Sequence, residues 1–325
     1  MSYEIKGMSY AYMSRRGDLK TDISRQSLLL LKEDNVNWIS LCVVQRVETV
    51  KDLTIRYNYN NNLTDTELIE FIKFAHENGF KICLKPMINS DDGRWRAEIN
   101  FFDDHGSWAK WFYEYTGFMA HYAEIAEYTG VEMLCLGCEM LGTERREEEW
   151  RHLIKVVRDN YRGKLTYNTN HGHEFEAKWY DEVDYLGTSA YFRMRKKDQS
   201  GGNLIMDLTY EDMLYSWSQV KEEMRNFSLK YNKPIIFMEI GLRSAKGCAS
   251  QPWDFKMREL PYDEEEQALF YKSAMETFKD EDFMRGFFWW DWPVWIAKTG
   301  MREKDTGFCI YKKEAERVLK EYYSL

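Results

Sequence analysis

Two glutamates are the strongest candidates for chemistry in this chain. Glu139 ends the apolar run 133–138, and Glu239 ends the apolar run 234–238. A carboxylate at the mouth of a buried strand costs free energy unless it is paired or used. If both strands belong to one barrel, we expect the two carboxyl groups to face each other as a general acid/base and a nucleophile. Such a pair, about 5 Å apart, can hydrolyse a glycosidic bond with retention.

A structural role is the alternative for either glutamate alone. A carboxylate at a strand end can cap the following helix or pair with an arginine, and ion pairs of that kind resemble catalytic sites. The two glutamates, however, end the fourth and the seventh of eight strand-like runs. Because the C-terminal ends of barrel strands carry the catalytic groups, this placement favours catalysis.

The elements that must position these glutamates alternate along the chain. Strand-like runs occupy residues 7–12, 36–44, 80–88, 132–139, 164–170, 183–191, 234–240 and 285–292. Helical patterns occupy residues 24–32, 108–128, 146–159, 210–231, 264–278 and 313–322, and Thr64 with Glu67 forms a capping box before another helix. Alternation of this kind indicates parallel pairing, and eight units can close into a barrel. We therefore predict one catalytic (β/α)8 TIM barrel domain over residues 1–325. An open doubly wound sheet is the rival, but no glycine-rich phosphate loop follows the first strand.

Composition narrows the functional classes. Hydrophobic residues make up 44% of the chain and only five residues are proline, which suits one large core. The formal net charge of −9 disfavours nucleic acid as a partner. No segment has the length of a membrane span, and no signal peptide is visible, although a processed secreted form could have lost one. Six cysteines, mostly within apolar strands, indicate reduced thiols and a cytoplasmic location. The oligomeric state is not predicted.

Aromatic residues and long loops suggest how a ligand is held. The loops 89–106 and 243–262 follow the third and seventh strands and should form the walls of a cleft. Trp290 and Trp292 alternate onto one side of the last strand and could stack against a sugar, with Trp95 as a wall. Core packing is the alternative for both, and we prefer it for Trp289 on the opposite side.

Several short motifs, in this order, resemble glycoside hydrolase family 113, the retaining endo-β-mannanases of clan A. The matching segments are 84–86, 94–99, 136–139, 237–241 and 286–292. The resemblance implies hydrolysis of β-1,4-mannosidic bonds in mannan, glucomannan or mannooligosaccharides. It implies that Glu139 is the general acid/base, that Glu239 is the nucleophile, and that Tyr191 donates a hydrogen bond to the nucleophile. A tyrosine packing a loop at the rim is the alternative for Tyr191.

One departure from the clan pattern concerns the position before the acid/base. Many clan members have asparagine there, donating to the sugar 2-hydroxyl, whereas this chain has Cys138, and a thiol is a weak donor. Asn170 or Lys85 could replace that contact, and Asn89 lies at the end of the third strand among the binding candidates. Lys85 within a buried strand needs a partner, which could be Glu139, a neighbour or the sugar itself.

The remaining motifs are weaker. His171 and His173 with Glu174 are poor evidence for a metal site, and we expect no metal or cofactor. The pair Cys135 and Cys138 is interpreted as structural. The charge run 144–149 is interpreted as the solvated start of a helix. Two alternatives stay open for the function, namely a related glycosidase acting on glucan, xylan or galactan, and a carbohydrate-binding barrel without activity.

Overall fold

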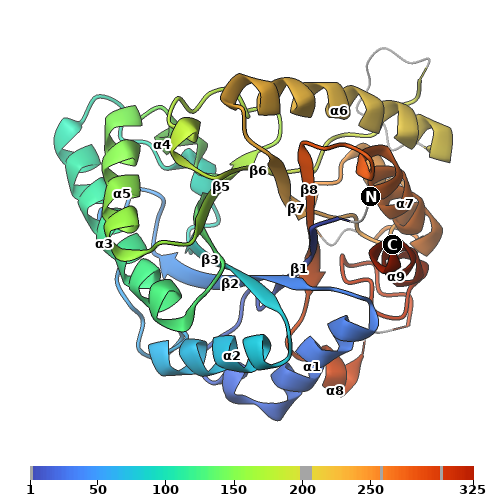
Figure 1. Cartoon of the computed structure of the whole chain (residues 1–325), viewed down its shortest axis with the longest axis horizontal. Helices are drawn as coiled ribbons and strands as arrows, with labels where there is room; N and C mark the ends of the chain where they lie inside the picture. The colour runs from blue at the N-terminus through green and yellow to red at the C-terminus, as the bar shows by residue number, and fades with distance from the viewer. Residues whose placement is uncertain (1–2, 198–206, 257–258, 301–302) are drawn as a thin grey trace.

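The computed structural model describes residues 3–197, 207–256, 259–300 and 303–325, which form one closed barrel of parallel strands surrounded by helices (Figure 1). The strands pair in chain order, and β8 closes on β1. They are β1 Ile5–Tyr10, β2 Trp38–Val47, β3 Lys81–Ser90, β4 Met133–Cys138, β5 Lys164–Asn170, β6 Tyr185–Ser189, β7 Ile235–Ile240 and β8 Met284–Trp292. The predicted (β/α)8 barrel is therefore confirmed.

Helices follow the strands and cover the outside of the barrel. They are α1 Asp22–Glu33, α2 Asp65–Glu77, α3 His105–Thr129, α4 Leu141–Glu144, α5 Glu147–Asn160, α6 Tyr210–Tyr231, α7 Glu264–Phe278, α8 Ile296–Thr299 and α9 Glu314–Ser324. The predicted capping box is present, because the Thr64 hydroxyl accepts from the Glu67 amide and the Glu67 carboxylate accepts from the Thr64 amide. Among the helices that the structure describes, none is both long and apolar enough to cross a membrane.

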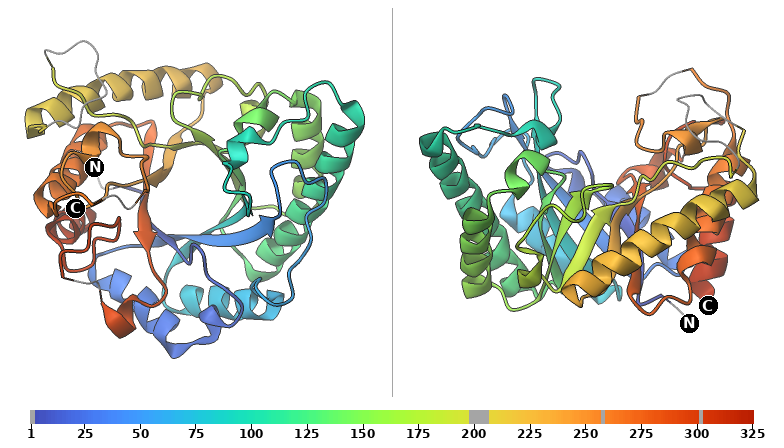
Figure 2. Two further views of the ribbon diagram at one scale, coloured as in Figure 1. Left: turned by 180° about the vertical axis from the view of Figure 1, so that it is seen from behind. Right: turned by 90° about the horizontal axis from the view of Figure 1, so that it is seen from above.

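The long loops after β3 and β7 rise above the same end of the barrel (Figure 2, right). This is the end at which parallel strands finish, as the prediction of cleft walls requires. Residues 257–258 of the second predicted loop lie outside the described residues. In the described part of that loop, Trp253 stacks against His171, with ring centroids 5.5 Å apart. Chain segments after β5 and β7 thus meet at this rim.

One sequence prediction about β8 is wrong. The pairing of β1 with β8 shifts register, so that Met8 lies opposite Trp289 and Tyr10 opposite Trp292. The irregularity interrupts the alternation of side chains along the strand. Trp292 is 1% exposed and donates its indole N–H to the Ser27 carbonyl of α1 at 2.8 Å. It therefore packs in the core beneath α1 and does not share a face with Trp290 at the barrel mouth.

A second correction concerns Glu144, which sequence reasoning placed on a solvated surface. Its side chain is buried behind β5 and accepts hydrogen bonds from the Tyr167 hydroxyl at 2.8 Å and the Thr169 hydroxyl at 3.1 Å. Burial raises the pKa of Glu144 from 4.5 to about 7. The residue thus belongs to a buried polar group between the barrel and α5.

Glu144→Gln should flatten the dependence of stability on pH. The native state holds a proton on Glu144 that the unfolded chain has released between pH 4.5 and about 7. The contribution of Glu144 to the free energy of unfolding is therefore greatest below pH 4.5. It is lost as the pH rises through 7, and the loss can reach about 3 kcal/mol. We expect the melting temperature to fall less between pH 5 and pH 8 in Glu144→Gln than in the parent. Glu148→Gln, at an exposed position of the same charge run, should behave like the parent.

Candidate active site

The structure brings both predicted catalytic glutamates to the C-terminal end of the barrel. Glu139 directly follows β4, and Glu239 lies near the end of β7. Their exposed fractions are 9% and 4%, so each carboxylate is largely withdrawn from water. Glu139 has a φ of 51°, an uncommon conformation for a residue with a side chain, and its amide donates to the Asn168 carbonyl at 2.7 Å. Uncommon backbone conformations of this kind cluster at functional sites.

Arg96 and Cys138 connect the two carboxylates through three short contacts. The Arg96 guanidinium lies 3.0 Å from Glu139 Oε2 and 3.3 Å from Cys138 Sγ. The Cys138 thiol in turn donates to Glu239 Oε1 at 3.2 Å. Glutamates from strands 100 positions apart (239 − 139) therefore share one pocket.

Besides the Cys138 thiol, three donors hold Glu239, from β3, from β5 and from the segment that follows β6. Lys85 Nζ lies 2.5 Å from Oε1, and Asn168 Nδ2 lies 3.2 Å from the same oxygen. The Tyr191 hydroxyl donates to Oε2 at 3.2 Å, as the resemblance implied for that position. Burial alone would raise the pKa of Glu239, but the charges of Lys85 and Arg96 hold it below its ordinary value. The group is consequently a carboxylate at neutral pH, the form that a nucleophile needs.

Lys85 is fully buried, and its partner is Glu239; the structure shows no contact with Glu139 among the described side chains. Burial opposes the charge of Lys85, yet interactions with the neighbouring Cys138 and Glu239 raise its pKa well above the ordinary value. Of the roles left open by the sequence, pairing with a neighbouring carboxylate is the one that the geometry supports.

Lys85→Met should reduce kcat/KM at neutral pH by about a hundredfold or more. Without the ammonium group, burial dominates and the pKa of Glu239 rises, because an unpaired buried charge costs several kcal/mol. The acidic limb of the pH–rate profile should therefore move to higher pH, and activity should recover partly in alkaline buffer. Lys81→Met, at the exposed start of the same strand, should leave the profile unchanged. An unshifted acidic limb in Lys85→Met would contradict this role.

The loop after β3 supplies the neighbours of Glu139. The Trp95 indole N–H lies 3.3 Å from Glu139 Oε2, beside the Arg96 contact. Arg96 is fixed from two further sides, since it donates to the Cys138 carbonyl at 2.9 Å and to Asn89 Oδ1 at 2.6 Å. Trp95 is 44% exposed, so its ring can also contact a ligand. The prediction that this loop forms a wall of the site agrees with these contacts.

An aromatic pair lies on the other side of the mouth. The rings of Tyr12 and Trp290 meet edge to face, with centroids 4.5 Å apart, and the Tyr12 hydroxyl accepts from Asn89 Nδ2 at 3.2 Å. The Lys85 ammonium lies 6.0 Å from the Trp290 ring centroid, which places this half-buried indole beside the Lys85–Glu239 pair. Trp290 is thus close enough to this pair for its predicted contact with a sugar to stay a prediction for the same pocket.

Sequence reasoning missed Asn168, Tyr12 and the role of Arg96. Asn168 precedes the predicted Asn170 by two positions on β5, so alternation places both on one face of the strand. That spacing could have identified Asn168, whereas only the fold shows that it reaches Glu239. Asn170 lies at the end of β5 and is 6% exposed.

Burial and the nearby Glu239 raise the pKa of a third carboxyl, Asp291, to about 7.

The residues considered for a metal have other neighbours. His173 Nδ1 lies 2.7 Å from Glu176, and Glu174 accepts from the Thr188 hydroxyl at 2.9 Å. Within the described ranges, no three or more histidine, cysteine or acidic side chains gather as metal ligands do. All six cysteines are buried and free.

Comparisons with known proteins identify relatives of this chain. The model of Glycoside Hydrolase Family 113 matches residues 8–313. A complex structure of a GH113 β-1,4-mannanase is 32% identical, has a TM-score of 0.87, and covers 100% of this chain and 99% of its own. The GH113 β-mannanase AaManA from Alicyclobacillus acidocaldarius, in complex with ManMIm, is 33% identical, has a TM-score of 0.86, and covers 100% and 98%. A Ruminococcus gnavus β-glucuronidase, 16% identical with a TM-score of 0.60 over 99% of this chain and 50% of its own, shares the fold alone. No curated protein sequence matches the chain.

Proposed function

Because this chain belongs to Glycoside Hydrolase Family 113 and is a glycoside hydrolase, we propose that it hydrolyses β-1,4-mannosidic bonds with retention. Its substrates are mannan, glucomannan or mannooligosaccharides. Support comes from the two β-mannanases that match over the full chain at 32% and 33% identity. The observation that carries the mechanism is the pairing of Lys85 with Glu239, which keeps a buried carboxylate ionised beside a second glutamate.

In this mechanism Glu239 attacks the anomeric carbon and forms a glycosyl-enzyme. Glu139 protonates the leaving oxygen, then takes a proton from the water that releases the sugar. Lys85, Asn168 and Tyr191 hold the nucleophile in place through the contacts described above. Holding a reacting group in a fixed position removes part of the entropic barrier.

Many clan members use an asparagine at the position of Cys138 to contact the sugar 2-hydroxyl. In this chain we assign that contact to Asn168. Its amide nitrogen lies 3.2 Å from both Cys138 Sγ and Glu239 Oε1, so it occupies the space beside the thiol. The amide is a better donor than the thiol. Trp290 forms the floor under the sugar, and Trp95 forms a wall. Asn89 acts indirectly, because its side-chain oxygen accepts a hydrogen bond from Arg96. Asn170 lies further along β5.

The direct test is a panel of mannan, glucomannan, β-glucan, xylan and galactan with product analysis. We expect release of reducing ends from the mannose-containing polymers, and NMR during the first turnovers should show the β-anomer of the product. Faster hydrolysis of another polymer would replace the substrate, and initial release of the α-anomer would exclude retention. Binding of mannan without any hydrolysis would favour a carbohydrate-binding barrel.

A further inference from the structure

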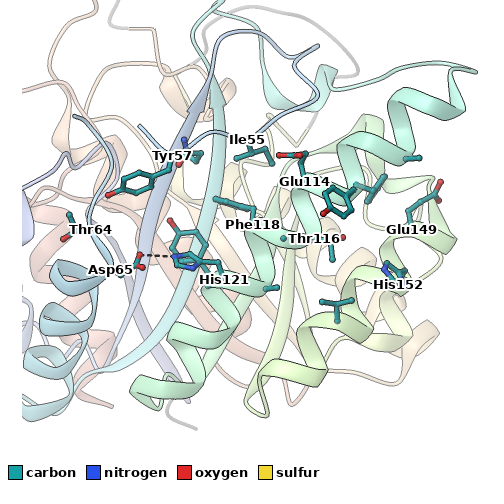
Figure 3. Close-up of a pocket in the computed structure, with 18 of the residues that line it drawn as sticks. Ile55, Tyr57, Thr64, Asp65, Glu114, Thr116, Phe118, His121, Glu149 and His152 are labelled. Atoms are coloured by element: carbon teal, nitrogen blue, oxygen red, sulfur yellow. Dashed lines mark hydrogen bonds and ion pairs between the residues drawn. The ribbon is translucent and has the colours of Figure 1, made fainter. Parts of the chain in front are cut away.

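A large groove lies on the outer wall of the barrel, and Figure 3 shows side chains that line it. Its volume is about 1320 Å³, and it runs from residues 55–66, which lead into the start of α2, across α3 to α5. Among the described residues, those that contact Glu139 or Glu239 do not line it. The groove is therefore a separate feature of the molecule, and the proposed mechanism does not use it.

Exposed tyrosines stand on both sides of this groove. Tyr59 is 77% exposed and lies edge to face with Tyr57, at 5.0 Å between ring centroids. Tyr113, on α3, is 74% exposed. Exposed tyrosine rings offer apolar faces with a polar tip, which suits the CH faces and hydroxyl groups of a sugar.

Hydrogen-bonding groups also line the groove. Asp65 at the start of α2 lies 3.0 Å from His121 of α3, and this pair bridges the groove. Glu114 of α3 and Glu149 with His152 of α5 also line it. Carboxylates accept hydrogen bonds from hydroxyl groups, and their charge disfavours phosphates and other anions. The lining thus fits a neutral ligand rich in hydroxyls.

Gly117 keeps the groove open where it crosses α3. A glycine inside a helix is destabilising relative to alanine. Packing does not require it here, because a Cβ at Gly117 would meet no atom within 4 Å. The missing side chain instead lowers the surface between Tyr113 and His121, which lie one helical turn before and after it. A ligand lying across the helix benefits from this depression.

We propose that the groove is a second carbohydrate site, which binds a β-1,4-linked, mannose-containing chain while the barrel mouth cleaves it. The volume exceeds the range of about 300–1,000 Å³ for pockets that hold one small molecule, so several sugar units fit better than one. Binding a polymer at two places raises its effective concentration at the active site. The identity of the sugar rests on the proposed function, whereas the existence of the site rests on the groove itself.

The test uses Glu239→Ala as the background, so that polymer is bound without being cleaved. Affinity electrophoresis in gels containing soluble glucomannan or galactomannan should show retardation. Adding Tyr59→Ala with Tyr113→Ala should weaken the apparent Kd at least about tenfold, because two exposed ring faces are removed. Gly117→Leu should weaken it similarly by filling the groove. Matched controls are Tyr128→Ala, an exposed tyrosine near the end of α3, and Gly117→Ala, which adds one methyl group.

The same substitutions in the active enzyme separate the groove from the catalytic site. We expect kcat/KM on mannotriose to stay within twofold of the parent and hydrolysis of polymer to fall severalfold. Unchanged polymer binding in both the double tyrosine variant and Gly117→Leu would overturn the groove proposal and leave the proposed function intact. The groove proposal would also be overturned if sedimentation showed a dimer that these substitutions dissociate, because a second copy of the chain would then occupy the groove. If the proposed function is wrong, the parent enzyme will not hydrolyse mannans. Gels containing other β-glycans would then identify the polymer that the groove binds.

Discussion

Glu239→Ala should lower kcat on mannan by at least about 10⁴-fold, the scale seen when an enzyme loses its nucleophile. The methyl group cannot attack the anomeric carbon, and the double displacement loses its first step. Lys85 then has no carboxylate partner, so its pKa should fall and the barrel should remain folded, as circular dichroism can verify. Reducing-end release at enzyme concentrations well above those used for the parent gives the measurement.

Azide distinguishes a lost nucleophile from general damage to the site. In Glu239→Ala the small anion can enter the space beside Lys85 and attack an aryl β-mannoside directly. One displacement inverts the configuration, so the product should be the α-mannosyl azide. Tyr191→Phe is the matched control, because it removes one hydrogen bond to the same carboxylate and should cost only about tenfold without azide rescue. A β-mannosyl azide from Glu239→Ala would contradict the assignment.

The fold was largely predictable because its signals are local. Apolar strand-like runs occur eight times with helical patterns between most of them, and the limits predicted for α6 and α7 coincide with those observed. Trp292 shows where local reasoning fails. Its side follows from the register shift between β1 and β8, and a single strand contains no information about the neighbour with which it pairs. Glu144 was misplaced for the same reason, since its partners lie on β5.

The candidate site was predictable to the level of the two glutamates. The sequence shows that Lys85 needs a partner, because it interrupts an apolar strand, but the choice of Glu239 depends on how β3 and β7 approach across the closed barrel. Because side chains alternate along a strand, the sequence places Asn168 and Asn170 on the same face of β5 and does not distinguish them. Their depths in the barrel depend on strand stagger, which links side chains of different strands into layers. Only the assembled barrel places Asn168 between Cys138 and Glu239.

Glu139→Ala should produce a kinetic pattern opposite to that of Glu239→Ala. On mannan, kcat/KM should fall by about 10²–10⁴-fold, the usual contribution of a general acid, because the leaving sugar oxygen is no longer protonated. An aryl mannoside with an acidic leaving group, such as dinitrophenolate, needs no protonation, so its first step should remain fast. Water then attacks slowly without a base, and the glycosyl-enzyme on Glu239 should accumulate. Mass spectrometry of the intact protein should show the added sugar, and KM for the aryl mannoside should fall.

Azide completes the comparison, because it attacks the accumulated intermediate without needing a base. Two successive inversions give the β-mannosyl azide, the anomer opposite to that expected from Glu239→Ala. Trp95→Phe removes the indole donor to Glu139 while keeping an aromatic ring, and should reduce the rate only modestly with no azide product. Loss of activity on mannan and on the activated aryl mannoside to the same extent would contradict an acid/base role for Glu139. The neighbours Arg96 and Trp95 would then hold a structural carboxylate. The proton donor would have to be sought among other acids near Glu239, such as the half-buried Asp291, whose pKa is raised to about 7.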